Sequence, residues 1–440
     1  MTGREVTGRV VVAGAGPAGM HAALAAAAAG AEVLLLDSEP AAGGQYHRRP
    51  YGEPGPVPRH PRITFQGATT VWAVEPGLRA CLRLHLRHGP PDHPAARMSA
   101  LDAAALVIAT GAYDRVVPFP GWELPGVVTA GGAQAMAKGH RVAVGRRVLV
   151  AGTGPFLLPV ALSLLDVGAE VVGVLEAARP GRTVRAWAGR PGAWPAAAGK
   201  LPELARYAAA LARRGVPYRT GTAVVAAHGD DALESVTTAR VDSRWRPLPG
   251  SRRRIAVDAL CVGHGFTPRL ELALAAGCAL DDGYVAVDAR QATSVSGVYA
   301  AGEVTGIGGA TLAAYEGTLA GLAAARHLGL TAPENPTVGR RVRRGRAFAA
   351  GLAAAYPIGD GWREWLTADT VICRCEEVPY AALTSAVDHG AESVRALKLS
   401  CRVGLGLCQG RVCGQNAADL ADARRADAGA APLPDRAALH

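Results

Sequence analysis

Four cysteines near the end of the chain have the spacing of ligands to an inorganic cluster. Cys373 and Cys375 form a Cys-x-Cys pair, and Cys408 and Cys413 form a Cys-x4-Cys pair after 32 intervening residues. Four Cys thiolates hold a [2Fe-2S] cluster, and two short pairs flanking a helical segment surround it with little loop-closure cost. Nearby glycines let the backbone turn tightly around such a core (Gly404, Gly406, Gly410 and Gly414). The sequence therefore predicts an iron-sulfur cluster.

Four thiols with this spacing have two other uses in proteins. Four cysteines also satisfy a tetrahedral zinc site, so zinc remains an alternative, although a redox character elsewhere in the chain favours iron. Disulfides are disfavoured because the N-terminal segment runs directly into an apolar strand and predicts no secretory signal. A reducing compartment is therefore expected.

The cluster segments CRCEEV (373–378) and CQGRVC (408–413) resemble the ferredoxin-like domain of bacterioferritin-associated ferredoxin. In that family the position of Cys401 is usually not cysteine, which implies that Cys401 is not a ligand. The remaining cysteines stand singly among apolar residues and are predicted to be inert core thiols (Cys81, Cys261 and Cys278).

A dinucleotide-binding turn is predicted near the start of the chain. An apolar strand at 9–13 leads into the motif Gly14-Ala-Gly16-Pro17-Ala-Gly19 and then into an alanine-rich helix. In such a motif the first glycine allows the turn, the second admits the pyrophosphate and the third lets helix pack on strand. Asp37 ends the next strand, where an acid accepts the ribose hydroxyls. The alternative is a glycine-rich turn in an unrelated α/β fold.

FAD and NAD share this turn, so the rest of the chain must decide between them. The segments Gly43–Tyr46, Leu106–Gly111 and Thr293–Glu303 resemble those that contact the flavin in the family of flavoproteins with two dinucleotide domains. Glu303 stands where that family has Asp, and the longer side chain keeps the same acceptor. The resemblance implies these FAD contacts: Gly44, Gln45, Thr110, Gly111, Gly302, Glu303, Gly309 and Ala310.

A second, altered fingerprint follows the strand predicted at 147–151. It contains Gly152 and Gly154, but Leu157 replaces the third glycine, and such a side chain is expected to push helix from strand. Glu176 ends the following strand and would favour an unphosphorylated ribose. Three alternatives stay open for this second Rossmann unit: it binds NAD(H), it binds another nucleotide such as ATP, or it binds nothing.

The chain lacks the cysteine pair of flavin-dependent disulfide reductases. Neither 43–50 nor 147–257 contains a cysteine, so the nucleophile of that reaction class is missing. His47 and His264 are candidates for proton transfer, although a lone histidine is more often structural. We assign no catalytic residue from the sequence.

Composition limits the other functional classes. The chain has a formal net charge of +10 and 5% aromatic residues, and its basic residues are mostly scattered arginines. No nucleic-acid motif appears, so we do not interpret the charge as nucleic-acid binding, and an acidic partner is the alternative. No apolar run reaches membrane-spanning length without Gly or charge. A cytoplasmic location, with peripheral attachment at the inner membrane through partners, is expected.

The predicted fold class is α/β, with two Rossmann-like domains, one inserted in the other, and a small C-terminal helical [2Fe-2S] domain. The predicted boundaries are 1–120 with 258–330 for FAD, 121–257 for the second Rossmann domain, 331–366 for a linker and helix, 367–424 for the cluster and 425–440 for a mobile tail.

Over nearly its full length the chain resembles the flavin-containing subunit of bacterial heteromeric amine dehydrogenases and oxidases, which include hydrogen cyanide synthase, octopine and nopaline oxidase and D-hydroxyproline dehydrogenase. The segments that carry the resemblance are 110–135, 262–278, 300–317 and 401–413. It implies a subunit that relays electrons from a partner β subunit similar to D-amino acid oxidases, often with a small ferredoxin-like γ subunit.

Two further hypotheses are kept. One is an NAD(P)H-dependent flavin reductase that passes electrons through its cluster to an acceptor protein, against which Leu157 counts. The other is an assembly and electron-transfer subunit with no substrate of its own.

Overall fold

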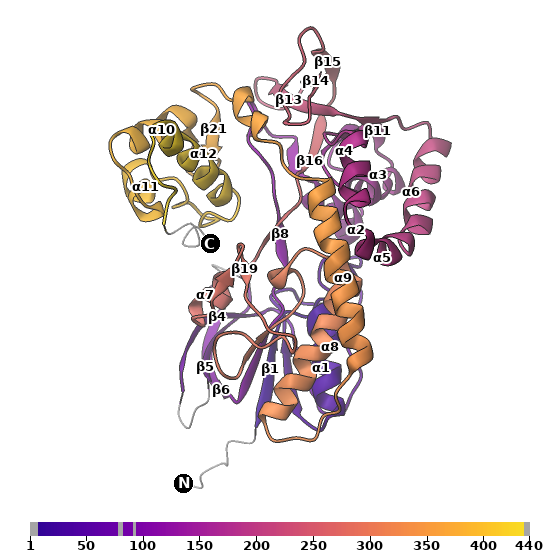
Figure 1. Cartoon of the computed structure of the whole chain (residues 1–440), viewed down its shortest axis with the longest axis vertical. Helices are drawn as coiled ribbons and strands as arrows, with labels where there is room; N and C mark the ends of the chain where they lie inside the picture. Colours follow the sequence, from indigo (N-terminus) through magenta and orange to yellow (C-terminus); the bar gives the residue numbers. More distant parts are fainter. Residues whose placement is uncertain (1–7, 78–81, 91–93, 435–440) are drawn as a thin grey trace. The chain divides into compact units, whose positions relative to one another are not determined.

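The computed structural model describes residues 8–77, 82–90 and 94–434 (Figure 1). Contacts divide the chain into two compact units, and each is built from segments that are distant in sequence. Unit 1 comprises Met1–Ala112, Gly192–Ala196 and Pro268–Ala350, and unit 2 comprises Tyr113–Pro191, Ala197–Thr267 and Gly351–His440.

Unit 1 is organised around a parallel sheet of order β20-β7-β1-β2-β3. Its strands are β1 (Arg9–Ala13), β2 (Glu32–Leu36), β3 (Ile63–Gln66), β7 (Ala105–Ile108) and β20 (Val298–Ala300). Val10, Val11 and Val12 have no exposed surface, as expected where both faces of a parallel sheet are covered.

Two helices of unit 1, α1 (Pro17–Ala28) and α8 (Gly309–His327), lie side by side (Figure 1). A Cβ atom added at Gly317 would lie 2.0 Å from the carbonyl oxygen of Ala18, and one at Gly321 would lie 2.1 Å from that of Ala22. The two helices therefore meet backbone to backbone. Small residues permit this approach, which explains the glycine and alanine content of both segments.

The rest of unit 1 surrounds this core. An antiparallel sheet contains β4 (Thr69–Pro76), β5 (Leu82–His88) and β6 (Arg97–Ala103). The smaller elements are α7 (Glu271–Ala275), β18 (Leu280–Asp281), β19 (Tyr284–Val285) and the 3-10 turn η3 (Glu303–Thr305). Apolar residues of α7, β5 and β7 share one buried cluster.

Unit 2 contains a second parallel sheet, of order β12-β11-β10-β16-β9. Its strands are β9 (Val127–Thr129), β10 (Arg147–Gly152), β11 (Glu170–Glu176), β12 (Tyr218–Thr220) and β16 (Ala259–Gly263). The helices α2 (Ala130–His140), α3 (Leu157–Asp166) and α6 (Leu201–Arg213) contribute to the core of this sheet.

An antiparallel sheet of β13 (Thr222–His228), β14 (Ser235–Arg240) and β15 (Arg253–Ala256) also belongs to unit 2. Helix α4 (Pro180–Ala188) is also in unit 2. Four short elements contain residues of both units: β8 (Ala112–Asp114), η2 (Pro191–Ala193), α5 (Trp194–Ala198) and β17 (Phe266–Pro268).

The C-terminal part of unit 2 is small and mainly helical. It contains η4 (Asp360–Trp365), β21 (Val371–Cys373), β22 (Val378–Pro379), α10 (Tyr380–Asp388), α11 (Val394–Cys401) and α12 (Gly414–Asp427). Its core is continuous with that of the preceding sheets, because Trp362 and Leu383 share one buried cluster with Phe119 and Trp122.

The segment predicted as a linker is largely structured. Helix α9 (Pro336–Ala355) occupies most of it, and η4 follows. The Trp365 ring stacks on Trp245 with 6.1 Å between ring centroids, and the Trp365 indole N–H donates to the Trp245 carbonyl at 3.1 Å. Arg244 also pairs with Asp360. Within unit 2, the segment before the cluster is therefore held against the β14–β15 connection.

The predicted tail from residue 425 begins inside α12. Beyond that helix, the Leu433 side chain is 3% exposed, and its backbone N–H donates to Asp422 Oδ1 at 2.7 Å. The chain up to residue 434 thus packs against α12. None of the helices among the described residues is both long and apolar enough to cross a membrane.

Candidate functional site

The first glycine motif forms a tight turn at the end of β1 in unit 1. Gly14 has φ +108°, and a Cβ there would lie 2.2 Å from the Ala109 carbonyl oxygen. A Cβ at Gly19 would lie 1.7 Å from the Gly14 oxygen, so only glycine allows α1 to begin so close to β1. Pro17 occupies the first turn of α1, where its missing N–H costs nothing. The N-terminus of α1 is thus open to an anionic group.

A second glycine loop meets this turn. Gly44 has φ +57°, and a Cβ there would lie 2.9 Å from the Gly16 Cα. The neighbouring Gln45 side chain instead accepts a hydrogen bond from Arg48, at 3.2 Å. The structure therefore brings Gly44 to the predicted phosphate-binding turn.

Asp37 holds the turn in shape. Its Oδ2 atom accepts from the Ala15 N–H at 2.6 Å, and its Oδ1 atom accepts from the Glu39 N–H at 2.9 Å. Burial raises the pKa of the Asp37 carboxyl, and the two N–H groups oppose the shift. The predicted ribose acceptor is thus also a structural partner of the glycine turn, a role that the sequence motif does not reveal.

The third predicted flavin segment follows β20. Gly302 has φ +84°, and a Cβ there would lie 2.9 Å from the Ala18 Cβ, so this turn lies against the start of α1. The Glu303 carboxylate accepts from the Gly309 N–H, and burial raises its pKa. Gly309 and Ala310 form the first turn of α8. Thr110 and Gly111 follow β7 in the same unit, and the Thr110 hydroxyl donates to the Arg269 carbonyl at 2.9 Å.

Glu316 is a functional candidate that the sequence analysis missed. It lies on α8, is 1% exposed, and its Oε2 atom accepts from the Gly302 N–H and the Thr305 hydroxyl, each at 3.0 Å. Its Oε1 atom accepts from Arg346 Nε at 2.9 Å. One buried carboxylate therefore fixes the turn that carries Glu303. No motif marks it, because its partners come from distant segments.

The altered second fingerprint in unit 2 folds differently from the first. Helix α3 begins at Leu157, five residues after Gly152, whereas α1 begins at Pro17, three residues after Gly14. The Leu157 side chain is 1% exposed and shares a buried cluster with Val148 and Val150 of β10. Leu157 is therefore accommodated by a later helix start, and helix and strand stay packed.

Glu176 is bound by the loop of this second fingerprint. Its two oxygens accept from the Thr153 hydroxyl and from the Gly154 and Ala178 N–H groups, each at 2.7 Å. Burial raises its pKa against these bonds. A cavity of about 240 Å³ opens beside it and is lined by Glu176, Ala178, Pro180, Thr183, Val184, Tyr218, Thr220 and Tyr356.

The four predicted cluster thiols come together in the C-terminal part of unit 2. Cys413 is hydrogen-bonded to Cys373 and to Cys408, and Cys408 is also hydrogen-bonded to Cys375. A Cβ at Gly406 would lie 2.2 Å from the Cys375 Cβ, so the backbone passes directly over this side chain. In the described part of the chain, no group of three or more His, Cys, Asp or Glu side chains is arranged for a single metal ion. The sulfurs form a chain of neighbouring pairs instead.

Hydrogen bonds favour thiolates at two of these positions. The Cys413 thiol, with N–H groups of Gly404, Glu376 and Cys375, lowers the pKa of Cys373 to about 6 despite burial. Cys413 likewise lowers the pKa of Cys408 to about 5, helped by the Val412 and Gly410 N–H groups. The same bonds raise the pKa of the donor Cys413, and burial raises that of Cys375. Iron-sulfur clusters are held by thiolates whose sulfurs accept hydrogen bonds, so Cys373 and Cys408 have the surroundings of cluster ligands.

The loop between the first two cysteines is attached to the preceding domain of unit 2. The Arg374 guanidinium lies 5.2 Å from the ring centroid of Trp122 and donates to the Glu123 carbonyl at 3.1 Å. Trp122 in turn donates its indole N–H to the Val371 carbonyl at 2.5 Å. Arg374 and Trp122 therefore hold the cluster loop in place.

The single histidines have structural surroundings. His264 is 7% exposed, and its Nδ1 atom accepts from the Val117 N–H at 3.2 Å. Burial, with a smaller effect of Arg115, lowers the pKa of His264 to about 3. The His47 ring packs edge-on against Tyr46 with 4.8 Å between centroids.

The other described cysteines are buried or half-buried. Burial raises the pKa values of Cys261, Cys278 and Cys401. The Cys401 thiol donates to the Leu397 carbonyl at 3.2 Å, within its own helix. Cys81 lies outside the described residues.

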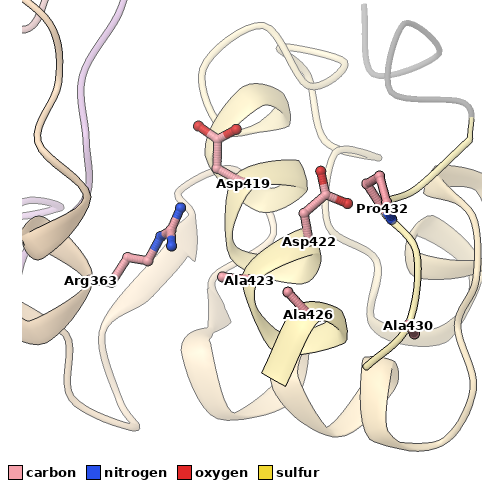
Figure 2. A pocket seen from close by; sticks show the side chains of 7 residues that line it. All are labelled: Arg363, Asp419, Asp422, Ala423, Ala426, Ala430 and Pro432. Atoms are coloured by element: carbon pink, nitrogen blue, oxygen red, sulfur yellow. The ribbon is translucent and has the colours of Figure 1, made fainter. Parts of the chain in front are cut away.

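A larger cavity, of about 380 Å³, contains none of the predicted site residues (Figure 2). It is lined by Arg363, Asp419, Asp422, Ala423, Ala426, Ala430 and Pro432. Its carboxylates have partners within unit 2, since Asp419 pairs with Arg115 at 2.7 Å and Asp422 accepts from Leu433. We interpret it as a gap beside α12.

Together, a glycine turn at the N-terminus of α1, an acidic turn against it and four gathered thiols define a flavin-dependent oxidoreductase with an iron-sulfur domain. The chain belongs to the pyridine nucleotide-disulphide oxidoreductase family, whose model matches residues 8–318. A BFD-like [2Fe-2S] binding domain matches residues 371–423, which favours this cluster over zinc. FAD and [2Fe-2S] are its cofactors.

Two relatives match nearly the whole chain. Hydrogen cyanide synthase subunit HcnB of Pseudomonas aeruginosa is 34% identical over 433 residues, covering 92% of this chain and 90% of that protein. The A subunit of opine oxidase from Agrobacterium tumefaciens is 30% identical over 445 residues, covering 93% and 85%. The structure of L-proline dehydrogenase from P. horikoshii is similar in fold alone, with a TM-score of 0.65, 19% identity, and coverage of 96% of this chain and 76% of that one.

Proposed function

We propose that this chain is the FAD- and [2Fe-2S]-containing electron-transfer subunit of a heteromeric amino-acid or amine dehydrogenase or oxidase. The observation that carries the proposal is that one chain contains both an FAD-binding region and a [2Fe-2S] region. Over 92% of its length this chain is also similar to HcnB, which is named as a subunit of hydrogen cyanide synthase. FAD takes up two electrons and a [2Fe-2S] cluster carries one, so the pair suits conversion between two-electron and one-electron carriers.

The ligand roles are part of this proposal. FAD is held by the α1 turn and the loops that meet it: Gly14, Gly16, Pro17, Gly19, Asp37, Gly44, Gln45, Thr110, Gly111, Gly302, Glu303, Gly309 and Ala310. The close approach of the Gly44 loop and the Gly302 turn to the start of α1 supports this assignment. The cluster is held by Cys373, Cys375, Cys408 and Cys413, which the hydrogen-bonded chain of thiols supports.

The proposed partner is a β subunit similar to D-amino acid oxidases, which oxidises the amine and delivers electrons to this chain. A small ferredoxin-like γ subunit completes the proposed assembly. The names of the two relatives, each of which denotes one subunit of a larger enzyme, support a heteromer. The predicted cytoplasmic location, with attachment to the inner membrane through partners, stays a prediction.

An anaerobic titration of the purified chain tests the function. One sample receives NADH and another a panel of amino acids, and visible absorbance and electron paramagnetic resonance follow flavin and cluster. We expect neither to reduce the isolated chain and dithionite to reduce both centres. Added β subunit should then permit reduction by an amino acid. Turnover of an amine by the isolated chain would contradict the division of labour.

A second candidate, an NAD(P)H-dependent flavin reductase, is favoured by the nucleotide-like fold of unit 2 and by the cavity beside Glu176. The late start of α3 counts against it. The cavity volume of about 240 Å³ is below the range typical for whole drug-sized ligands. We therefore propose that Gly152, Gly154 and Glu176 form at most a low-affinity site for NAD(H) or ATP. Rapid bleaching of the flavin by NADH would reverse this ranking.

A further inference from the structure

The four cluster thiols differ in their access to solvent. Cys373 and Cys413 are each 1% exposed, whereas Cys408 is partly exposed and Cys375 is exposed. A cluster held by these residues therefore has a protected side and a solvent side. Cys375 and Cys408 mark the solvent side.

Exposed apolar side chains stand close in sequence to the two solvent-side thiols. Leu405 and Leu407 flank Gly406, the residue whose backbone passes over Cys375, and they are 40% and 93% exposed. Leu399 is 73% exposed, and Val412, which precedes Cys413, is 38% exposed. These four belong to the seventeen exposed large apolar residues of the described chain, yet they lie within 14 consecutive positions. Single exposed leucines are normal, but such a concentration beside a redox centre marks an interaction site.

The same stretch of chain is basic. Between residues 393 and 418 every charged residue is positive (Arg395, Lys398, Arg402 and Arg411). Arg395 and Leu399 are four residues apart on α11, and Arg402 follows at its C-terminus, so they share one side of the helix. Arg402 also pairs with Glu376 at 2.6 Å, which offsets the acid nearest to Cys375. We call this set the cluster-edge surface: Arg395, Leu399, Arg402, Leu405, Leu407 and Val412.

We propose that the cluster-edge surface docks a separate one-electron carrier protein whose contact face has an apolar centre and an acidic rim. The proposal rests on the proposed relay function and adds the site at which electrons leave the cluster. Each encounter passes one electron from the reduced cluster to the oxidised carrier, and no bond is formed or broken. The leucines supply desolvated contact beside Cys375 and Cys408, and the exposed Arg395 steers an acidic carrier toward them.

The test uses the full chain with its cofactors, reduced without oxygen by the stoichiometric amount of dithionite that fills both FAD and the cluster, with no excess left to reduce the acceptor. Stopped-flow absorbance follows electron transfer to cytochrome b5, an acidic haem protein, and to cytochrome c, a basic one. We expect cytochrome b5 to react faster, and its rate constant to fall about fivefold between about 50 and about 300 mM salt. Leu407→Ser should lower the rate constant about tenfold, and Arg395→Gln about threefold.

Two controls separate docking from damage. Leu201→Ser replaces a leucine that is 60% exposed on α6 and should leave the rate unchanged. Oxidation by ferricyanide, which needs no protein docking, should be the same in the wild type and in Leu407→Ser. Equal losses in Leu407→Ser and Leu201→Ser, or a faster salt-independent reaction with cytochrome c, would overturn the proposal.

Two other occupants of the surface would also overturn it. A dimer in light scattering that dissociates in Leu407→Ser would assign the surface to a second copy of the chain. Binding to anionic lipid vesicles that is lost in Leu407→Ser would assign it to a membrane. Because dithionite loads the cluster directly, a chain that receives no electrons from a β subunit would still reduce cytochrome b5. In that case the relay function would fail and the docking surface would stand.

Discussion

The carboxylate of Glu316 joins the Arg346 guanidinium, at 2.9 Å, to the backbone N–H of Gly302, at 3.0 Å. Glu316 is 1% exposed, so its charge depends on these partners. The Glu316–Arg346 ion pair therefore stabilises the turn that carries the proposed flavin ligand Glu303. No sequence motif predicts this ion pair.

Glu316→Gln should weaken both the fold and the retention of FAD. The variant loses the negative charge that pairs with Arg346, which should lower the free energy of unfolding by about 1–3 kcal/mol. This loss is smaller than for a fully buried ion pair because Arg346 is partly exposed. Urea unfolding and the rate of FAD release measure the two effects. Glu334→Gln, which removes an exposed pair with Arg290, should change stability by less than about 0.5 kcal/mol. If Glu316→Gln and Glu334→Gln had the same free energy of unfolding and the same rate of FAD release, Glu316 would not stabilise the flavin-binding turn.

Gly19→Ala should yield protein with little bound flavin. The new Cβ would lie 1.7 Å from the Gly14 oxygen, so α1 must move away from β1 and from the phosphate-binding turn. The ratio of flavin to protein absorbance after purification provides the measurement. Gly181→Ala is the matched control, because its Cβ would meet no atom within 4 Å. A normal flavin content in Gly19→Ala would contradict the proposed FAD site.

Cys408→Ser should lose the cluster, and Cys401→Ser should keep it. The two residues lie in the same domain, but only Cys408 takes part in the chain of four thiols, whereas Cys401 donates within α11. Iron and acid-labile sulfide analysis, with the electron paramagnetic resonance signal of the reduced protein, distinguishes the variants. If the wild-type protein contained iron but no acid-labile sulfide, the four cysteines would hold a mononuclear metal instead of a cluster.

His264 should make the protein less stable as the pH falls below 6.5. Its folded pKa of about 3 lies under the ordinary value of 6.5, so between these values the unfolded chain binds more protons. The loss is about 1.4 kcal/mol per pH unit, or about 2 kcal/mol at about pH 5. His264→Asn keeps an acceptor for the Val117 N–H and should show a flatter pH dependence. If the free energy of unfolding of the wild type and of His264→Asn changed equally with pH, His264 would not contribute to the acid destabilisation.

The parts of the fold that local sequence determines were predicted well. Parallel strands buried on both faces appear as apolar runs, and the glycine spacing reflects close contacts of Gly14 and Gly19. These conformations depend on residues within one short segment, so the sequence of that segment is enough to predict them.

Features that depend on distant partners were not predictable in this way. The partners of Glu316 come from a turn and a helix on either side of it. Arg374, between Cys373 and Cys375, packs on Trp122, which is far away in sequence. Only the folded chain brings these residues together.

The backbone contact between α1 and α8 has a consequence for biosynthesis. Ala18 and Gly317 touch although 299 positions separate them, and the intervening chain includes the whole second dinucleotide fold. During translation the first glycine turn leaves the ribosome long before the helix against which it packs. The nascent chain can therefore acquire its flavin only after residues up to about 327, the end of α8, have emerged. Premature termination anywhere before that point should release a polypeptide unable to retain FAD.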